Sequence, residues 1–431
     1  MINKCKIALL LQLWNISTIT YGFLATHKSK YLSKTIPKER ITQYMKDNPN
    51  NDHYSTNDNL THTKSMKRRD VIALGGYITG MKSYNALLSN ANAQETTIPK
   101  VKLGSLSISR TIQGYWQLAG GHGKYKEGDA INNMKHHYKS GITTLDTADI
   151  YGPSESIMGK FVKDVGLENV VPCTKFCCFR FLDEIDKNEV RTRILKSCER
   201  LQVSQLPLVQ FFWSNYDSKR YVDVALMLTE LKEEGLIKEI GATNFDLKRL
   251  QELKKADVPI VSHQVQLSAM DRRPIQSGMS DWCNENDIKL IAFGTVGSGI
   301  LSNKYLDAKK PASEQLNTSS LRMYAKTASR FGDWKLVQEL LHTMNDIATS
   351  VNDSGRGSNV NIGNVAQRYV LDGTPSVASV LIGVRNCDHI EENVRTHSFS
   401  LRQDEIDAID NVVRKRDGPK GDVWDLERGY I

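Results

Sequence analysis

The chain has 431 residues, 40% of them hydrophobic and 25% charged, which is typical of a soluble globular protein with one large domain or two ordinary ones. The net charge of +8 does not indicate a nucleic-acid partner, because residues 1–93 hold 13 Lys and Arg against 5 Asp and Glu and so carry all of it. The number of cysteines, seven, is odd, and no two of them form a C-x-x-C pair. This argues against a disulfide framework and against a zinc site, and we expect no bound metal.

The first 93 residues have the composition of targeting segments. Residues 1–24 combine a short basic start with the apolar run "IALLLQLWNISTITYGFLA", which is typical of a signal peptide and too interrupted for a stable membrane span. Residues 27–67 are rich in Lys, Ser, Thr and Asn, so we expect a disordered, transit-like segment. Arg68 and Arg69 then precede a mildly apolar stretch that ends in an A-x-A site at Ala91–Ala93, as in a twin-arginine signal.

The order of these three segments predicts a localisation. It is similar to the stacked presequence of an alga with a complex plastid, and it indicates the plastid, with the thylakoid lumen as the address of the last signal. Two alternatives remain open. The first segment alone would send the chain into the secretory pathway, and the basic stretch at Arg68–Arg69 could be a helix that packs on the body of the protein.

Short β-branched runs alternate with amphipathic stretches through the rest of the chain. We predict eight strands, at Arg110–Trp116, Thr143–Asp149, Val170–Phe176, Leu208–Ser214, Ile237–Thr243, Ile260–Gln266, Lys289–Thr295 and Val377–Val384. Because helical stretches separate them, they favour an α/β fold, a (β/α)8 TIM barrel over residues 100–431.

A doubly wound dinucleotide-binding sheet is the rival fold. The segment "GTVGSG", Gly294–Gly299, follows an apolar strand, but its spacing is not G-x-G-x-x-G and no suitable acidic residue follows about 20 residues later. It fits better as the loop after the seventh barrel strand. The long polar connection that follows, roughly residues 303–333, is predicted to be irregular and to act as a flap on the substrate side.

Polar residues at the carboxyl ends of the strands indicate where the chemistry lies, because barrel active sites form there. Asp146 ends the second strand, Tyr151 follows it and Lys175 lies on the third. We expect Lys175 to lower the pKa of Tyr151, Asp146 to position Lys175, and Tyr151 to act as a general acid towards a carbonyl oxygen. The alternative is that Asp146 and Lys175 form a buried ion pair and Tyr151 only packs.

Several motifs together resemble the aldo-keto reductase superfamily over residues 104–427. They are "TTLDTADIYGPSE", "CTKF", "LVQFFW", "IKEIGATNFD", "HQVQLSAMDRRP", "IKLIAFGTVGSGILSNKYL", "LIGVRNCDHIEEN" and "GDVWDLERG". The resemblance implies a (β/α)8 barrel that reduces carbonyls with NADPH, and it implies that Asp146, Tyr151 and Lys175 are catalytic.

The resemblance also implies a set of NADP-binding residues. Thr243, Asn244 and Gln264 match the positions that hold the nicotinamide carboxamide, and Phe293 matches the aromatic position that stacks on the nicotinamide ring. Arg385, in "GVRN", matches the arginine that meets the 2′-phosphate, which favours NADP over NAD. The remaining cofactor positions are Trp116, Gly294, His389, Glu392 and Asn393.

The chain departs from the family at the end of the fourth strand. The family has a histidine there, whereas this chain has Phe212, which can neither donate a hydrogen bond nor relay a proton. We assign Phe212 and Trp213 to the substrate pocket. Three consequences are open: Tyr151 alone suffices, Ser214 or Asn215 supplies a donor, or the protein is an NADP-binding sensor with little turnover. The expected partner is a small carbonyl compound, and the sequence leaves its identity and the oligomeric state open.

Overall fold

The computed structural model describes residues 97–430, so the predicted targeting segment, residues 1–93, lies outside the described residues. The described part begins with a hairpin that the sequence did not predict, β1 (Lys100–Leu103) paired antiparallel with β2 (Leu106–Ser109). Leu103, Leu106 and Ile108 are buried against apolar side chains of four barrel strands. The hairpin therefore closes the amino-terminal end of the barrel, opposite the strand ends that carry the predicted site.

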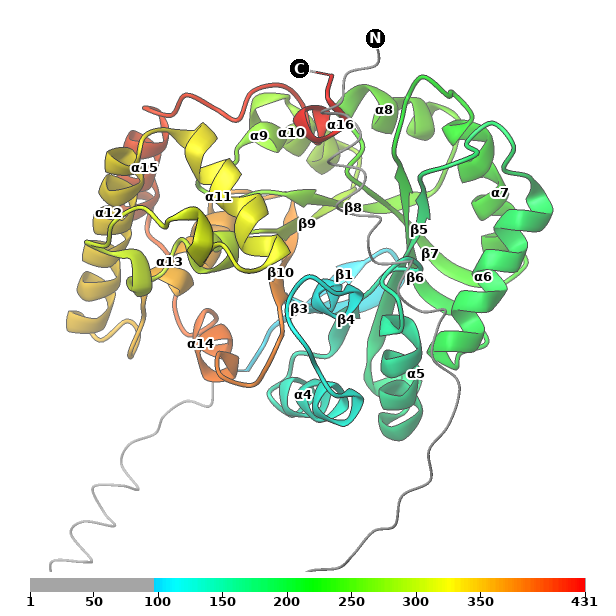
Figure 1. Ribbon diagram of the computed structural model, residues 1–431, viewed down its shortest axis with the longest axis horizontal. Helices are drawn as coiled ribbons and strands as arrows, with labels where there is room; N and C mark the ends of the chain where they lie inside the picture. The colour runs from blue at the N-terminus through cyan, green and yellow to red at the C-terminus, as the bar shows by residue number, and fades with distance from the viewer. Residues whose placement is uncertain (1–96, 431) are drawn as a thin grey trace, which may run out of the picture. The chain divides into compact units, whose positions relative to one another are not determined.

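Eight parallel strands form a closed barrel, as predicted (Figure 1). The strands pair in the order β10-β3-β4-β5-β6-β7-β8-β9, which is chain order around the ring. Their bounds are β3 (Thr111–Gly114), β4 (Thr144–Asp146), β5 (Val171–Cys178), β6 (Leu206–Trp213), β7 (Ile237–Thr243), β8 (Ile260–Gln266), β9 (Lys289–Phe293) and β10 (Val377–Gly383).

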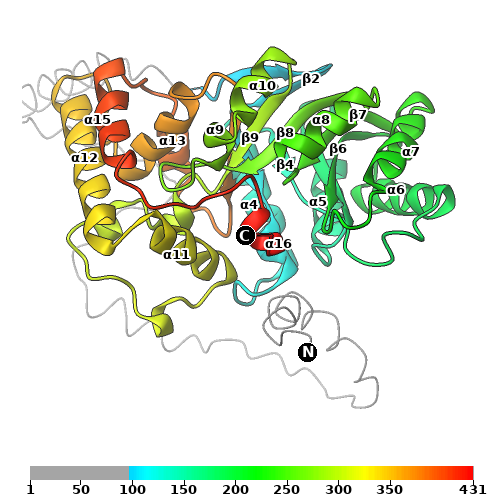
Figure 2. The ribbon, with the colours of Figure 1, turned by 90° about the horizontal axis from the view of Figure 1, so that it is seen from above.

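Helices surround the barrel and bury an apolar layer against its outer face. Those on one side are α4 (Glu127–Lys139), α5 (Ser154–Val165), α6 (Lys187–Leu201), α7 (Tyr221–Glu233) and α8 (Leu247–Lys255). The others are the short α9 (Arg273–Gln276) and α10 (Met279–Glu285), followed by α11 (Ser319–Phe331), α12 (Trp334–Asp353), α13 (Ile362–Asp372), α14 (Ile390–Arg395), α15 (Gln403–Val413) and α16 (Asp425–Arg428). Figure 2 shows α11, α12, α13 and α15 gathered at one side of the barrel.

The connection predicted as an irregular flap is partly helical. Residues before Thr318 contain only single turns, but α11 forms from Ser319 because the Thr318 side chain caps it by accepting a hydrogen bond from the Leu321 N–H. Leu321, Tyr324 and Ala328 are buried at helical spacing in a cluster shared with α12, α13 and α15. This segment is therefore a packed helix over its second half.

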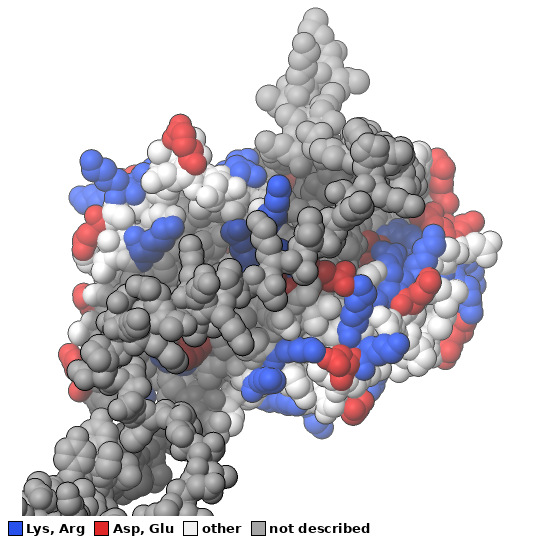
Figure 3. All heavy atoms as spheres, turned by 60° about the horizontal axis from the view of Figure 1, so that its bottom comes forward, with Lys and Arg blue, Asp and Glu red and all other residues white. Residues whose placement is uncertain are grey.

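Gly294–Gly299 follows β9 as a loop of turns, and Gly294 has a positive φ of 75°. Within residues 97–430, no helix is both long and apolar enough to cross a membrane. On the face that Figure 3 presents, Lys and Arg side chains are interspersed with Asp and Glu. The six cysteines of the described part are free thiols.

Candidate active site

A buried ion pair joins the ends of β4 and β5. Lys175 Nζ contacts Asp146 Oδ2 and also donates to the carbonyl oxygen of Thr147 at 2.8 Å. Burial alone would lower the pKa of Lys175, but the carboxylate of Asp146, with a smaller contribution from Tyr151, raises it overall. Lys175 is therefore held as a cation inside the barrel mouth.

Two glutamine side chains complete the environment of Asp146. Gln210 Nε2 on β6 and Gln264 Nε2 on β8 donate to Asp146 Oδ1 at 2.7 and 2.8 Å, and Gln264 also donates to Gln210 Oε1 at 2.9 Å. Both carboxylate oxygens thus have partners, which offsets the cost of burying the charge. This network fixes the carboxylate that positions Lys175.

Tyr151 lies beside this pair. The centroid of its ring is 5.1 Å from Lys175 Nζ, so the three residues predicted to be catalytic are brought together. Burial is the largest effect on the pKa of Tyr151 and raises it to about 12. Lys175 lowers this pKa, as expected, but by less than burial raises it, so the net shift is upward. Tyr151 therefore carries its proton at neutral pH.

An apolar cluster lies against Tyr151. Phe212 is buried at the end of β6 and packs with Ala148, Cys177 and Tyr151. Its ring centroid is 5.0 Å from that of Phe179 and 6.4 Å from that of Trp424, which meets it edge-on. Phe212 therefore lies beside Tyr151 at the barrel mouth, and Trp424, which packs against it, was not predicted as a site residue.

Trp213 has the opposite orientation. Its side chain is fully buried in the layer between strands and helices, against Phe211 and Tyr221, and Nε1 donates to the Ser218 carbonyl at 3.0 Å. Successive strand residues face opposite sides, so Trp213 must point outward when Phe212 points into the mouth. This placement contradicts the assignment of Trp213 to the substrate pocket.

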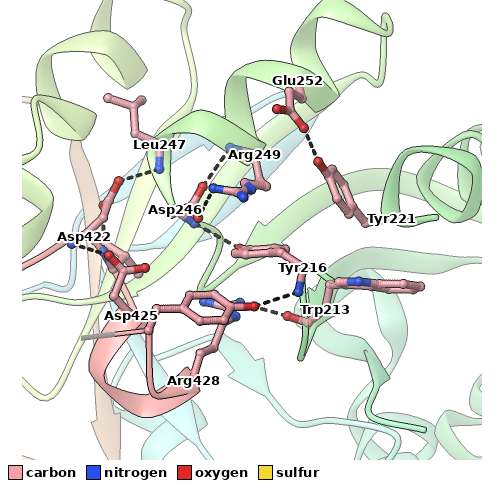
Figure 4. Close-up of polar contacts among 12 residues, drawn as sticks. Trp213, Tyr216, Tyr221, Asp246, Leu247, Arg249, Glu252, Asp422, Asp425 and Arg428 are labelled. Carbon is pink, nitrogen blue, oxygen red and sulfur yellow. Dashed lines mark hydrogen bonds and ion pairs between the residues drawn. The ribbon is translucent and has the colours of Figure 1, made fainter. Parts of the chain in front are cut away.

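The carboxyl-terminal segment holds the ends of β6 and β7 (Figure 4). Arg428 Nη2 donates to the carbonyls of Trp213 and Asn244, each at 2.8 Å. Asp422 accepts from the Leu247 N–H at 2.8 Å, and the Tyr430 hydroxyl accepts from the Tyr216 N–H at the same distance. These contacts place Trp424 beside Phe212.

The residues assigned to the nicotinamide are partly engaged within the protein. The Gln264 side-chain nitrogen is bonded to Asp146 and Gln210, so it serves the carboxylate rather than standing free for a carboxamide. The Thr243 hydroxyl donates to the Gln264 carbonyl at 3.1 Å. Asn244 Oδ1 is buried without a partner among the described residues, as is the hydroxyl of Thr295, which the sequence reasoning missed. Such orphaned polar atoms fit a site for a polar cofactor.

Phe293 and Gly294 lie at the end of β9. Phe293 is half-buried, which leaves ring surface for stacking. A Cβ added to Gly294 would come within 2.5 Å of Cε1 of Tyr324, so glycine is required here both by its positive φ and by this close approach. Tyr324, on α11, was not found from the sequence because its segment was expected to be irregular.

The residues assigned to the adenosine end gather near the end of β10 and on α14. Arg385 is exposed, and its Nη2 would lie 2.8 Å from a Cβ built on Gly123, in the loop after β3. His389 Nδ1 is 2.7 Å from Glu392 Oε2, and the Asn393 N–H donates to the His389 carbonyl at 2.9 Å. An exposed guanidinium is free to take a phosphate.

The loop after β3 is joined to the start of α11. Trp116, in this loop, packs its ring edge-on against His122 with centroids 5.1 Å apart. His122 Nε2 lies 2.7 Å from Ser320 Oγ, and the Ser319 N–H donates to the Gly121 carbonyl at 3.0 Å. Segments about 200 residues apart in the chain thus meet beside the barrel mouth.

Comparison with known proteins relates this site to a family. Residues 111–414 match the model of the aldo/keto reductase family. The chain is 26% identical over 349 residues to a chloroplastic pyridoxal reductase of Arabidopsis thaliana, covering 76% of this chain and 88% of that protein. It is 24% identical to an aldo-keto reductase of Strobilurus tenacellus, covering 75% of this chain and 92% of that protein.

Solved structures share the fold. A glycerol dehydrogenase from Gluconobacter oxydans superposes with a TM-score of 0.62 at 20% identity, covering 76% of this chain and 98% of that one. The holo form of an aldo-keto reductase from Bacillus halodurans gives a TM-score of 0.57 at 23% identity, covering 73% and 96%. At these identities the likeness shows the barrel architecture and no more.

Proposed function

Because the chain belongs to the aldo/keto reductase family, we propose that it reduces a carbonyl group with NADPH, with Tyr151 as the general acid. One observation carries this proposal: the ring centroid of a protonated, partly buried tyrosine lies 5.1 Å from the ammonium of Lys175, near the ends of two adjacent barrel strands. Bound NADPH would supply the hydride. The phenol of Tyr151 would give its proton to the carbonyl oxygen, and Lys175, held by Asp146, would stabilise the tyrosinate that remains.

The residues present fit the cofactor. Asn244 Oδ1 and the Thr295 hydroxyl are unpartnered polar atoms at strand ends, Phe293 offers an aromatic face, and Arg385 offers an exposed guanidinium. The guanidinium is the reason to propose NADPH rather than NADH, because its planar fork suits the 2′-phosphate. Arg385→Gln should therefore weaken NADPH binding and leave NADH binding unchanged.

Titration of the purified chain with NADPH and a panel of carbonyl compounds tests the activity. Pyridoxal belongs in the panel because a relative is a pyridoxal reductase, and an aromatic aldehyde belongs there because Phe212, Phe179 and Trp424 form an aromatic wall. We expect NADPH oxidation that is lost in Tyr151→Phe. NADPH binding without oxidation of any compound in the panel would overturn the reductase proposal.

A second candidate is an NADP-binding sensor with little turnover. It is favoured by one observation, the buried Phe212 where a donor would face the carbonyl. Saturable NADPH oxidation that disappears in Tyr151→Phe would exclude it.

For localisation we propose the plastid, with the thylakoid lumen as the final address and the secretory pathway as the alternative. The support is the order of the signals in residues 1–93. A fluorescent fusion of residues 1–100 tests it, and fluorescence confined to the endoplasmic reticulum and its export route would favour the alternative.

A further inference from the structure

The side of the mouth around Phe212 offers no strong donor to a substrate oxygen. Phe212, Ala148 and Cys177 line it, and the Cys177 thiol is a weak donor. A carbonyl oxygen becomes more negative as hydride arrives, and it has lone pairs for more than one hydrogen bond. Tyr151 provides one. A second donor would have to come from another side of the mouth.

Helix α11 brings a second tyrosine to that mouth. The helix is tied to the loop after β3 through Ser320 and to β8 through Thr327, whose hydroxyl accepts from Gln266 Nε2 at 3.0 Å. Tyr324 lies one turn before Thr327, on the same face of the helix. Its ring packs on Gly294, so that its hydroxyl would be 2.9 Å from a Cβ at that position.

Among the described residues, the Tyr324 hydroxyl has no hydrogen-bond partner. The residue is only 8% exposed. Burial, with a further contribution from the nearby Tyr151, raises the pKa of Tyr324, so it stays protonated. Both tyrosines therefore carry O–H groups at neutral pH.

We propose that the Tyr324 hydroxyl donates a hydrogen bond to the substrate carbonyl oxygen and replaces the donor that Phe212 cannot supply. The inference rests on the proposed reductase function and deepens it. Tyr151 transfers its proton to that oxygen as the hydride adds to the carbonyl carbon, while Tyr324 keeps its own proton and stabilises the developing charge. Tyr324 is thus a catalytic residue contributed by a helix outside the strand-end set.

The test compares Tyr324→Phe with the matched variant Tyr305→Phe. Tyr305 is also 8% exposed and belongs to the same apolar cluster, but it lies outside α11, in the short turn Asn303–Tyr305. With pyridoxal or para-nitrobenzaldehyde as probe, Tyr324→Phe should lower kcat by about 10²-fold and leave the affinity for NADPH unchanged. Tyr305→Phe should change neither quantity.

A rescue experiment separates catalysis from packing. Phe212→His restores a donor on β6. The double variant with Tyr324→Phe should therefore have a kcat at least about tenfold higher than that of Tyr324→Phe alone. The proposal is overturned if Phe212→His does not raise the kcat of Tyr324→Phe, because Tyr324 then has a packing role. It is also overturned if Tyr324→Phe loses as much NADPH affinity as kcat, because Tyr324 then acts on the cofactor. Turnover that needs Tyr151 but not Tyr324 would overturn this inference alone, whereas a wild-type chain that oxidises no NADPH would overturn the proposed function with it.

Discussion

The imidazole of His122 accepts hydrogen bonds from Ser320, which joins the loop after β3 to the first turn of α11. Its Nδ1 is 2.8 Å from the Gly120 carbonyl, which can only accept, so Nδ1 carries the hydrogen. Nε2 then accepts from the Ser320 hydroxyl at 2.7 Å and from the Ser320 N–H at 3.3 Å. The link holds only while the ring is neutral, and burial, together with Arg385 and Arg322, lowers its pKa accordingly.

His122→Leu should loosen this link and speed the release of NADPH. Two hydrogen bonds at about 1 kcal/mol each correspond to roughly a 10-fold to 30-fold faster dissociation if they form only in the closed arrangement. Stopped-flow displacement of bound NADPH measures the rate. His136→Leu, at an exposed position on α4, is the matched control. Equal dissociation rates in the two variants would show that the link does not retain the cofactor.

Buried neutral histidines should make the fold sensitive to mild acid. Burial lowers the pKa of His263 to about 3 and that of His397 to about 4, with nearby arginines adding to both effects. In the unfolded chain both titrate near 6.5, so the unfolded state binds more protons below that pH. Stability is then complete above about pH 6.5 and is lost as pH falls towards the folded values, by about 1.4 kcal/mol per pH unit for each histidine.

The pH effect can be assigned by comparing two chains. We measure the free energy of unfolding in urea from pH 7 to pH 4.5. Its slope against pH should be less steep in His397→Gln than in the wild type, and the difference corresponds to one bound proton. Buried carboxyl groups titrate in both chains and cancel in the difference. Identical slopes would mean that His397 is charged in the folded state.

Gln264→Leu should damage both stability and catalysis. It removes a donor from Asp146 Oδ1 and leaves the buried carboxylate with one amide partner, Gln210. We expect the free energy of unfolding to fall by about 1–3 kcal/mol and kcat to fall because Lys175 loses its fixed partner. Urea denaturation and NADPH oxidation measure the two effects. Gln205→Leu, which removes a surface hydrogen bond, is the control and should change neither by a comparable amount.

Arg428→Met should raise KM for aromatic aldehydes more than it lowers kcat. The substitution removes the two hydrogen bonds that hold the carbonyls of Trp213 and Asn244, so Trp424 is no longer fixed against Phe212. The ion pair of Asp146 and Lys175 is untouched. Arg414→Met, at an exposed position, serves as control. A fall in kcat with KM unchanged would indicate that the carboxyl-terminal segment acts on the chemical step instead.

The barrel, and the meeting of Asp146, Tyr151 and Lys175 at its mouth, could be predicted because they follow local rules. β-branched runs mark the eight strands, and polar residues at strand ends mark the mouth. The β1–β2 hairpin was missed because its strands have four residues each and little periodicity. Trp213 was misplaced although strand alternation already separates it from Phe212. The raised pKa of Tyr151 depends on burial, which only the folded chain determines.

The Asp146 network and Tyr324 show a second limit of sequence reasoning. Gln210 and Gln264 are 54 residues apart, and nothing in their local sequence says that both amides point at one carboxylate. Tyr324 sits in a polar stretch whose helix depends on the Thr318 cap and on packing against α12. Both relationships arise from tertiary packing, which short motifs do not encode.

The β1–β2 hairpin limits how far the chain can be shortened by proteolysis. Leu103, Leu106 and Ile108 cover the apolar interior of the barrel at its amino-terminal end. A peptidase that cuts after Ala93 would leave these three residues in place. A cut at Arg110 would keep all eight barrel strands but expose their apolar interior to water, so a cleavage that leaves the fold intact would have to fall before Lys100.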